Sequence, residues 1–116
     1  MLFRSILGAA RMGDLGRLFP ADARTERGIA SDRLLAEVIG RVRAGGLAVT
    51  SIDLTIVGAR PRLAARLEAI GDRIAELVGL PADRVSVKAS TGNLEGMEGA
   101  GLGIAAEAIA IVAPVR

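Results

Sequence analysis

The sequence predicts an α+β fold in which helices cover one face of a β-sheet. Apolar residues recur at helical spacing over residues 31–44 and 63–78, whereas residues 47–57 alternate between apolar and polar side chains. Residues 85–89 and 102–113 add two further strands. Each helix has one apolar face, so the helices can cover only one side of the sheet. We expect the strands to be too apolar to leave the other side in water, and self-association is the simplest way to hide it.

The first two helices have recognisable ends. Residues 6–12 are typical of the last turns of a helix, which we expect Gly13 to close. Ser31 is a good N-cap for the next helix, and Gly45 and Gly46 end it. The glycines matter because a helix commonly ends at a residue in the left-handed conformation.

The second half of the chain contains three strands and one helix. In the first strand the apolar face carries Ile52, Leu54 and Ile56. A break at Arg60-Pro61-Arg62 separates it from a helix that begins at Leu63 and ends at Gly79. Residues 102–113 are small and apolar at both odd and even positions, which favours a buried strand, although their alanines would also suit a helix.

Composition excludes several classes of protein. With 51% hydrophobic residues and a mean hydropathy of +0.43 the chain can form a core, and it contains no histidine and no cysteine. Disulfides and metal sites built on imidazole or thiolate ligands are therefore excluded.

Fifteen Lys and Arg nearly balance thirteen Asp and Glu, and aromatic residues make up 2%, so the signature of a nucleic-acid binder is absent. No apolar run is long enough to span a membrane, and we expect a cytoplasmic protein.

Three segments next to the ends of regular elements are candidates for binding chemistry. Asp14 lies between glycines in Gly13–Pro20, where its carboxylate could hold a hydroxyl of a ligand, although a plain turn is the more ordinary interpretation. Gly58–Leu63 joins a strand to a helix, and its main-chain groups suit an anion or the edge of a base as well as they suit an ordinary loop.

The third segment, Lys88–Gly101, delivers two hydroxyls and then a glycine-rich turn. Ser90 and Thr91 can donate to phosphate oxygens, and glycine amides can surround an anion. The order of residues differs from that of a phosphate-binding P-loop. Together the three segments suggest a site for a phosphorylated, nucleotide-bearing ligand.

The order and spacing of these segments resemble the 2-C-methyl-D-erythritol 2,4-cyclodiphosphate synthase family from Ile6 to about Val112. The anchors of the resemblance are Leu7–Ala10, Gly13–Pro20, Ser31, Leu34-Leu35, Asp53–Val57, Pro61-Arg62, Val85–Thr91, Gly96, Gly99, Gly101 and Gly103–Ala105. The resemblance implies a mixed sheet whose uncovered face points to the axis of a homotrimer, with active sites between neighbouring subunits. It also implies a lyase of non-mevalonate isoprene biosynthesis. In that reaction the 2-phosphate of a cytidine-diphosphate-linked methylerythritol attacks the nearer phosphorus of the diphosphate, and CMP leaves.

The resemblance assigns roles by position. Three residues would contact the methylerythritol part: Asp14, Leu15 and Gly16. The loop that holds the phosphate end of the substrate would contribute Phe19, Pro20 and Asp22. The cytosine pocket would contain Gly58, Pro61, Arg62 and Leu63, and further substrate contacts would come from Ser90, Asn93 and Met97. Thr91 matches the catalytic position that stabilises the transition state.

This chain also departs from the family. The resemblance implies Zn and Mg or Mn, but the zinc ligands, an Asp-x-His pair and a second His, would lie upstream of Ile6. Asn93 replaces a metal-binding glutamate, and Ala100 replaces a diphosphate-binding arginine. Met97 occupies a position that is usually Phe in the family. Ala21-Asp22-Ala23 occupies the place of the family's usual Asp-x-Asp motif. We therefore expect no metal to be bound by this chain itself.

Two hypotheses fit the sequence, and they do not decide whether the chain is an enzyme. In the first, residues 1–5 are an unmatched leader, and residues 6–116 form one synthase-like domain that is incomplete at its N-terminus and inactive as given. In the second, the chain is a non-catalytic trimeric module that binds nucleotides or isoprenoid diphosphates.

Overall fold

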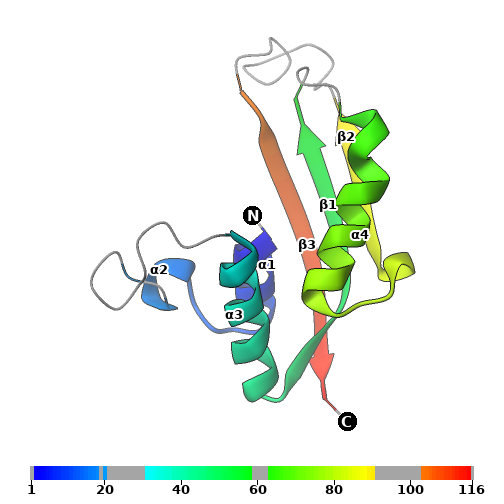
Figure 1. Cartoon of the computed structure of the whole chain (residues 1–116). Helices are drawn as coiled ribbons and strands as arrows, with labels where there is room; N and C mark the ends of the chain where they lie inside the picture. The colour runs from blue at the N-terminus through cyan, green and yellow to red at the C-terminus, as the bar shows by residue number, and fades with distance from the viewer. Residues whose placement is uncertain (1, 19, 21–30, 59–62, 91–102, 116) are drawn as a thin grey trace.

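The computed structural model describes residues 2–18, 20, 31–58, 63–90 and 103–115. Within them lies a three-stranded sheet with helices packed on one side (Figure 1). None of the described helices is both long enough and apolar enough to cross a lipid bilayer.

The sheet is mixed, with strand order β2-β1-β3. Its central strand, β1 (Leu47–Val57), pairs in parallel with β2 (Val85–Ser90) and antiparallel with β3 (Ala105–Pro114). The segment at 102–113 is thus a strand rather than a helix, as predicted, although it begins at Ala105. Its three β-branched residues, Ile109, Ile111 and Val112, favour an extended backbone over a helix.

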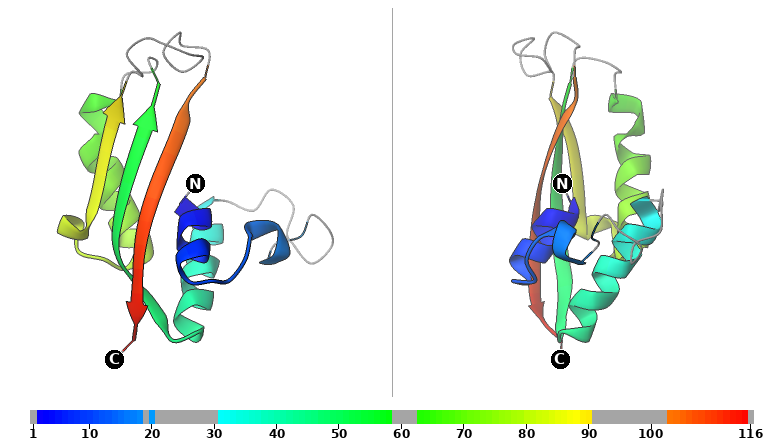
Figure 2. Two further views of the ribbon diagram at one scale, coloured as in Figure 1. Left: turned by 180° about the vertical axis from the view of Figure 1, so that it is seen from behind. Right: turned by 90° about the vertical axis from the view of Figure 1, so that its left-hand side faces the viewer.

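Two long helices cover one face of this sheet. These are α3 (Ser31–Ala44) and α4 (Leu67–Val78), and both lie on the same side in the edge-on view (Figure 2). Gly79 closes α4 as predicted, with a φ of 77° and its amide donating to the carbonyl of Ala75 at 2.9 Å. The α+β fold with helices on one face of a mixed sheet is therefore confirmed.

The start of α4 differs from the prediction. The sequence places the helix start at Leu63, but the chain first forms a short 3₁₀ turn, η1 (Ala64–Arg66), before α4 begins. The amide of Arg66 donates to the carbonyl of Leu63 at 2.8 Å, a tighter turn than an α-helix makes. A second short 3₁₀ turn, η2 (Ala82–Arg84), leads into β2.

The N-terminal helix, α1 (Leu2–Ala9), lies beside the outer edge of β3 (Figures 1 and 2). The hydroxyl of Ser5 donates to the carbonyl of Ala108 on that strand at 2.6 Å. The helix begins before Ile6, where the resemblance begins, and Leu2 and Phe3 pack against the core.

The prediction that Gly13 closes this helix is wrong. Arg11 takes the left-handed position, with a φ of 57°, and the next amide, that of Met12, donates to the carbonyl of Leu7 at 2.9 Å. This pair of features is a Schellman-type helix end, which needs a left-handed residue one or two positions past the last turn. After it comes a short helix that the sequence did not predict, α2 (Leu15–Leu18).

The core lies between the helices and the covered face of the sheet. Ile6, Leu7, Val38 and Val42 have almost no exposed surface, and Ile52 of the central strand is 3% exposed. Their side chains come from α1, α3 and β1, so removal of any one of these elements would open the core to water.

The other face of the sheet is not covered by any described element, and it is more polar than the sequence analysis expects. Strand pairing aligns Asp53 with Ser86 and Thr55 with Lys88 there. Its large exposed apolar side chains belong to β3, where Ile109 is 66% exposed and Ile111 is 57% exposed. In the single chain β3 is therefore half exposed rather than buried, because only alternate side chains point towards the helices.

Candidate functional site

The carboxyl ends of the two parallel strands meet at one edge of the sheet (Figure 1). Val57 pairs with Ser90 at that end, and the amide of Gly58 donates to the carbonyl of Ser90 at 2.8 Å. The first residue of β3, Ala105, pairs with Val57 from the other side. Three segments that are distant in the sequence therefore converge at the strand ends, which is where ligands bind in many sheets with parallel strands.

Gly58 is the tightest point of this convergence. A Cβ placed on it would lie 3.2 Å from Cγ1 of Ile104 and 3.6 Å from the carbonyl oxygen of Gly103. A side chain at this position would require Ile104 to give by a few tenths of an ångström, and glycine lets the two segments approach without that shift. Ile104 was missed as a site residue, and its only sequence signal is its position just before a strand that returns to this edge.

Leu63 is the next residue that the structure describes after Gly58. It precedes η1, and α4 continues from that turn. Gly58 and Leu63 thus mark the two ends of the segment predicted to hold a base, and both lie on the described part of the chain.

A charged pair stands on the open face two residues before Ser90. Nζ of Lys88 is 2.6 Å from Oδ1 of Asp53, and this ion pair links β2 to β1. Both side chains are about half exposed, at 56% and 46%. The pair was not predicted as part of the site, although the strand alternation already placed Asp53 on this face.

The Asp14 segment lies elsewhere in the molecule. Asp14 and Gly16 are exposed at the beginning of α2, and Oδ1 of Asp14 lies 3.7 Å from where a Cβ of Gly16 would be. Leu15 begins α2, and Pro20 follows that helix. This helix lies on the α1 side of the molecule, away from the converging strand ends (Figures 1 and 2). One chain therefore does not bring Asp14 together with Gly58 and Ser90.

Half of the predicted site residues lie outside the described part of the chain. They are Phe19, Asp22, Pro61, Arg62, Thr91, Asn93 and Met97. Their roles remain predictions that depend on the resemblance.

A zinc site does not fit the residues present. The sequence lacks histidine and cysteine, which supply most zinc ligands in proteins. Among the described residues no three acidic side chains gather where they could hold an ion together.

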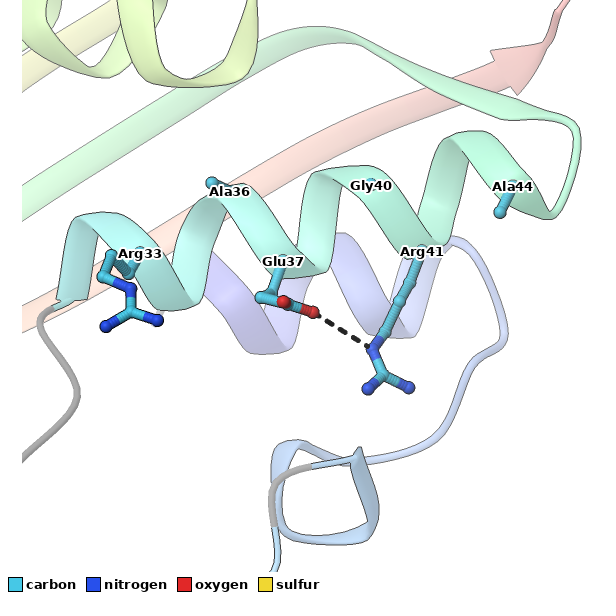
Figure 3. A pocket seen from close by; sticks show the side chains of 6 residues that line it. All are labelled: Arg33, Ala36, Glu37, Gly40, Arg41 and Ala44. Atoms are coloured by element: carbon cyan, nitrogen blue, oxygen red, sulfur yellow. Dashed lines mark ion pairs between the residues drawn. The ribbon is translucent and has the colours of Figure 1, made fainter. Parts of the chain in front are cut away.

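A hollow of about 460 Å³ lies on the outer face of α3, where Ala36, Gly40 and Ala44 leave little side-chain volume (Figure 3). Arg41 and Glu37 form an ion pair of 3.9 Å across it. All of its described lining residues belong to one helix, so no second described element lines it to orient a ligand. We therefore place the candidate site at the strand ends and not in this hollow.

Comparison with known proteins gives a consistent family. The model of the YgbB family matches residues 2–113. A 2-C-methyl-D-erythritol 2,4-cyclodiphosphate synthase of Methylococcus capsulatus is 43% identical over 109 residues, which cover 94% of this chain and 69% of that synthase. A bifunctional IspD/IspF enzyme of Anaeromyxobacter sp. is 43% identical over 112 residues, which cover 97% of this chain but only 29% of that enzyme.

Solved structures agree with the sequence matches. The bifunctional IspDF of Campylobacter jejuni superposes with a TM-score of 0.88 at 30% identity and covers 99% of this chain, which spans 31% of that protein. A 2C-methyl-D-erythritol-2,4-cyclodiphosphate synthase solved in a form bound to CDP superposes with a TM-score of 0.79 at 30% identity, covering 97% of this chain and 72% of that one.

Proposed function

Because the chain belongs to the YgbB family, whose similar members are cyclodiphosphate synthases, we propose that it forms the nucleotide-diphosphate-binding part of such a synthase. The reaction proposed is the conversion of a cytidine-diphosphate methylerythritol 2-phosphate to the cyclic 2,4-diphosphate and CMP. The proposed compartment is the cytoplasm.

The convergence of Gly58, Ser90 and Ile104 at the strand ends is the observation that carries this proposal. Main-chain amides and hydroxyls at the carboxyl ends of parallel strands are well placed to meet a phosphate. A similar synthase has been solved with CDP bound, and it shares this fold at 30% identity. The same class of ligand is therefore the best candidate for the strand ends of this chain.

The main contribution that this reaction requires from the chain is to hold the substrate in one geometry. The attacking phosphate and the diphosphate belong to one molecule, so fixing their relative position supplies a large part of the rate enhancement. We assign the diphosphate to Ser90, Thr91 and Asn93, and the cytosine to the segment between Gly58 and Leu63. An oxygen of the 2-phosphate then forms a bond to the nearer phosphorus as the bond to the CMP oxygen breaks.

We also propose that the site is completed by a second copy of the chain in a homotrimer. Asp14 directly precedes α2, which lies away from the strand ends in one chain (Figure 1), so the methylerythritol contacts must come from a neighbour if both belong to one site. The exposed Ile109 and Ile111 on the open face supply apolar surface for such an assembly.

No catalytic step is assigned to zinc, because the residues present do not fit that ion. The chain by itself is therefore expected to bind the nucleotide and to lack turnover. A non-catalytic nucleotide-binding module is the second candidate function, and the absence of histidine is the observation that favours it.

Calorimetric titration with CDP and CMP, with and without Mg²⁺, tests the shared part of both proposals. We expect saturable binding that Ser90→Ala weakens roughly three- to tenfold, since one hydrogen bond to a charged group is lost. Ser86→Ala is the matched control, because it removes the same hydroxyl from the same strand and face, four positions from the site.

Absence of CDP and CMP binding would contradict both candidate functions. Equal weakening by Ser90→Ala and Ser86→Ala would contradict the placement at the strand ends. Release of CMP from the substrate by the purified chain would contradict both the non-catalytic module and the expectation that the chain by itself lacks turnover.

A further inference from the structure

The outer edge of β2 carries a groove that the proposed nucleotide site does not use. It measures about 470 Å³ and lies between α4, η2 and the edge strand. Its lining residues are Leu67, Glu68, Gly71, Asp72, Ala82, Asp83, Val85, Ser86 and Val87. Figure 1 shows β2 at the margin of the sheet with α4 in front of it.

The backbone of β2 is available along this groove. The carbonyl of Ser90 faces β1, since it accepts the amide of Gly58. The amide and carbonyl of one residue in a strand point to the same side, and that side alternates along the strand. The amides and carbonyls of Val87 and Ala89 therefore point to the outer edge, where no described strand pairs with them.

The other edge of the sheet is treated differently. There α1 lies beside β3, and the Ser5 hydroxyl donates to the carbonyl of Ala108. An uncovered edge is a template for another strand, and proteins commonly cover it or place charges on it. Only the β2 edge combines an open backbone with an adjoining groove in the described part of the chain.

The groove has an apolar floor and an acidic rim. Val85 and Val87 are half-buried under α4, where Gly71 leaves room: a Cβ on Gly71 would be 3.6 Å from Cγ2 of Val87. Its charged lining residues are Glu68, Asp72 and Asp83, and none of the described residues that line it is basic. The chain as a whole is slightly basic, so this local excess of acid selects for a positively charged occupant.

We propose that this groove binds an extended, basic peptide segment of a partner protein, which adds to the sheet as a strand next to β2. Main-chain hydrogen bonds to Val87 and Ala89 supply affinity, as in other cases of strand addition. Side chains on the helix-facing side of the peptide meet the groove: an apolar one lies against Val87, and Lys or Arg at the next position on the same face, two residues along, reaches the acidic rim. The six residues of β2 extend about 20 Å at roughly 3.3 Å per residue, which sets the length of the bound segment.

The peptide and the nucleotide use different surfaces. The groove lies on the helix side of β2, while Lys88 points to the open face with its partner Asp53. The proposal therefore does not depend on the proposed synthase function.

Fluorescence anisotropy with a synthetic peptide tests it directly. The probe is a capped peptide in which the positions of one face alternate between valine and lysine, those of the other face are threonine, and one residue is tryptophan; the protein contains no Trp or Tyr, so the signal comes from the peptide alone. A version of the peptide with N-methyl groups on its ladder amides keeps the charge but cannot donate to the strand. We expect it to bind roughly tenfold more weakly, since two or more hydrogen bonds are lost.

Amide hydrogen exchange and paired variants locate the binding. We expect the amides of Val87 and Ala89 to gain protection on addition of the peptide. The double variant Glu68→Gln/Asp72→Asn should weaken binding roughly threefold or more at low salt, because both charges line the groove. Its control, Glu37→Gln/Glu76→Gln, removes the same charge from helix surfaces outside the groove and should leave binding unchanged.

Three outcomes would overturn the proposal. The first is equal binding of the N-methylated peptide, and the second is equal weakening by the control variant. The third is a self-association of the chain that the peptide competes away, because a second copy would then be the occupant of this edge.

Discussion

The two faces of the sheet use the same strands for different purposes. On the helix side, Ile52 and Leu54 of β1 are 3% and 7% exposed and belong to the interior. On the open side, Asp53 and Thr55 of the same strand stand beside polar residues of β2, and only β3 contributes large apolar side chains. In the single chain, buried apolar side chains of the sheet therefore stabilise the fold from the helix side. Substitutions on the open side can affect binding and assembly without unfolding the protein.

Matched isoleucine substitutions give the largest expected contrast between the faces. Ile52→Ala removes a side chain that is 3% exposed and should lower the free energy of unfolding by about 2–5 kcal/mol. Ile109→Ala removes the same atoms from a position that is 66% exposed and should cost no more than about 1 kcal/mol, mainly through strand propensity. Urea unfolding of both variants measures the difference, and similar losses would show that the open face is also part of the fold's interior.

Substitution at the strand ends tests the boundary between the faces. A valine at Gly58 would press on the Ile104 side chain, since its Cβ alone would lie 3.2 Å from Cγ1 of Ile104, so Gly58→Val should lower the free energy of unfolding by about 1–3 kcal/mol. It should also weaken the proposed CDP binding, because Ile104 must shift at the strand ends. Gly103→Ala is the control, since a Cβ there meets nothing within 4 Å. Calorimetry and urea unfolding together measure both effects, and unchanged CDP affinity in Gly58→Val would remove the strand ends as the binding site.

Much of the covered face could be predicted from the sequence, because it depends on local patterns. The alternation of Ile52 and Leu54 with Asp53 placed β1 correctly, and Gly79 ended α4 where a left-handed residue was needed. The end of α1 could not be predicted in the same way. Arg11 adopts the left-handed conformation that glycine usually takes, so the residue type at this position does not signal the end of the helix.

The candidate site was predictable only in part, for a different physical reason. The hydroxyl of Ser90 and the loop at Gly58 could be found from strand ends, but their contact depends on strand order, which the sequence does not give without the resemblance. Asp14 belongs to the same predicted site because its segment also lies next to the end of a regular element and could bind a ligand. Chemistry alone carries no information about distance, and in one chain Asp14 lies with α2 instead.

Charge placed on β3 tests whether the open face is an interface between copies. Ile109→Asp puts a carboxylate into the proposed trimer contact and should weaken assembly roughly tenfold or more, because an unpaired charge would be buried there. Val115→Asp is the control, since Val115 is also apolar and 56% exposed but lies beyond the end of β3. Sedimentation over a range of protein concentrations measures the effect. A wild-type chain that stays monomeric throughout would contradict the proposed trimer itself.

The smallest expected effect comes from the ion pair of Asp53 and Lys88. In the single chain both side chains are about half exposed, so a double-mutant cycle with Asp53→Asn and Lys88→Met should give a coupling below about 1 kcal/mol, and less at high salt. The pair of Asp32 and Arg73, with similar exposure and a distance of 3.6 Å, provides a control on the helix side. Assembly over the open face would exclude water from the first pair but not from the second. The coupling of Asp53 with Lys88 should therefore rise and lose its salt dependence at concentrations where copies associate, while that of the helix pair stays constant. Parallel behaviour of the two pairs at all concentrations would mean that the open face of the sheet remains in water.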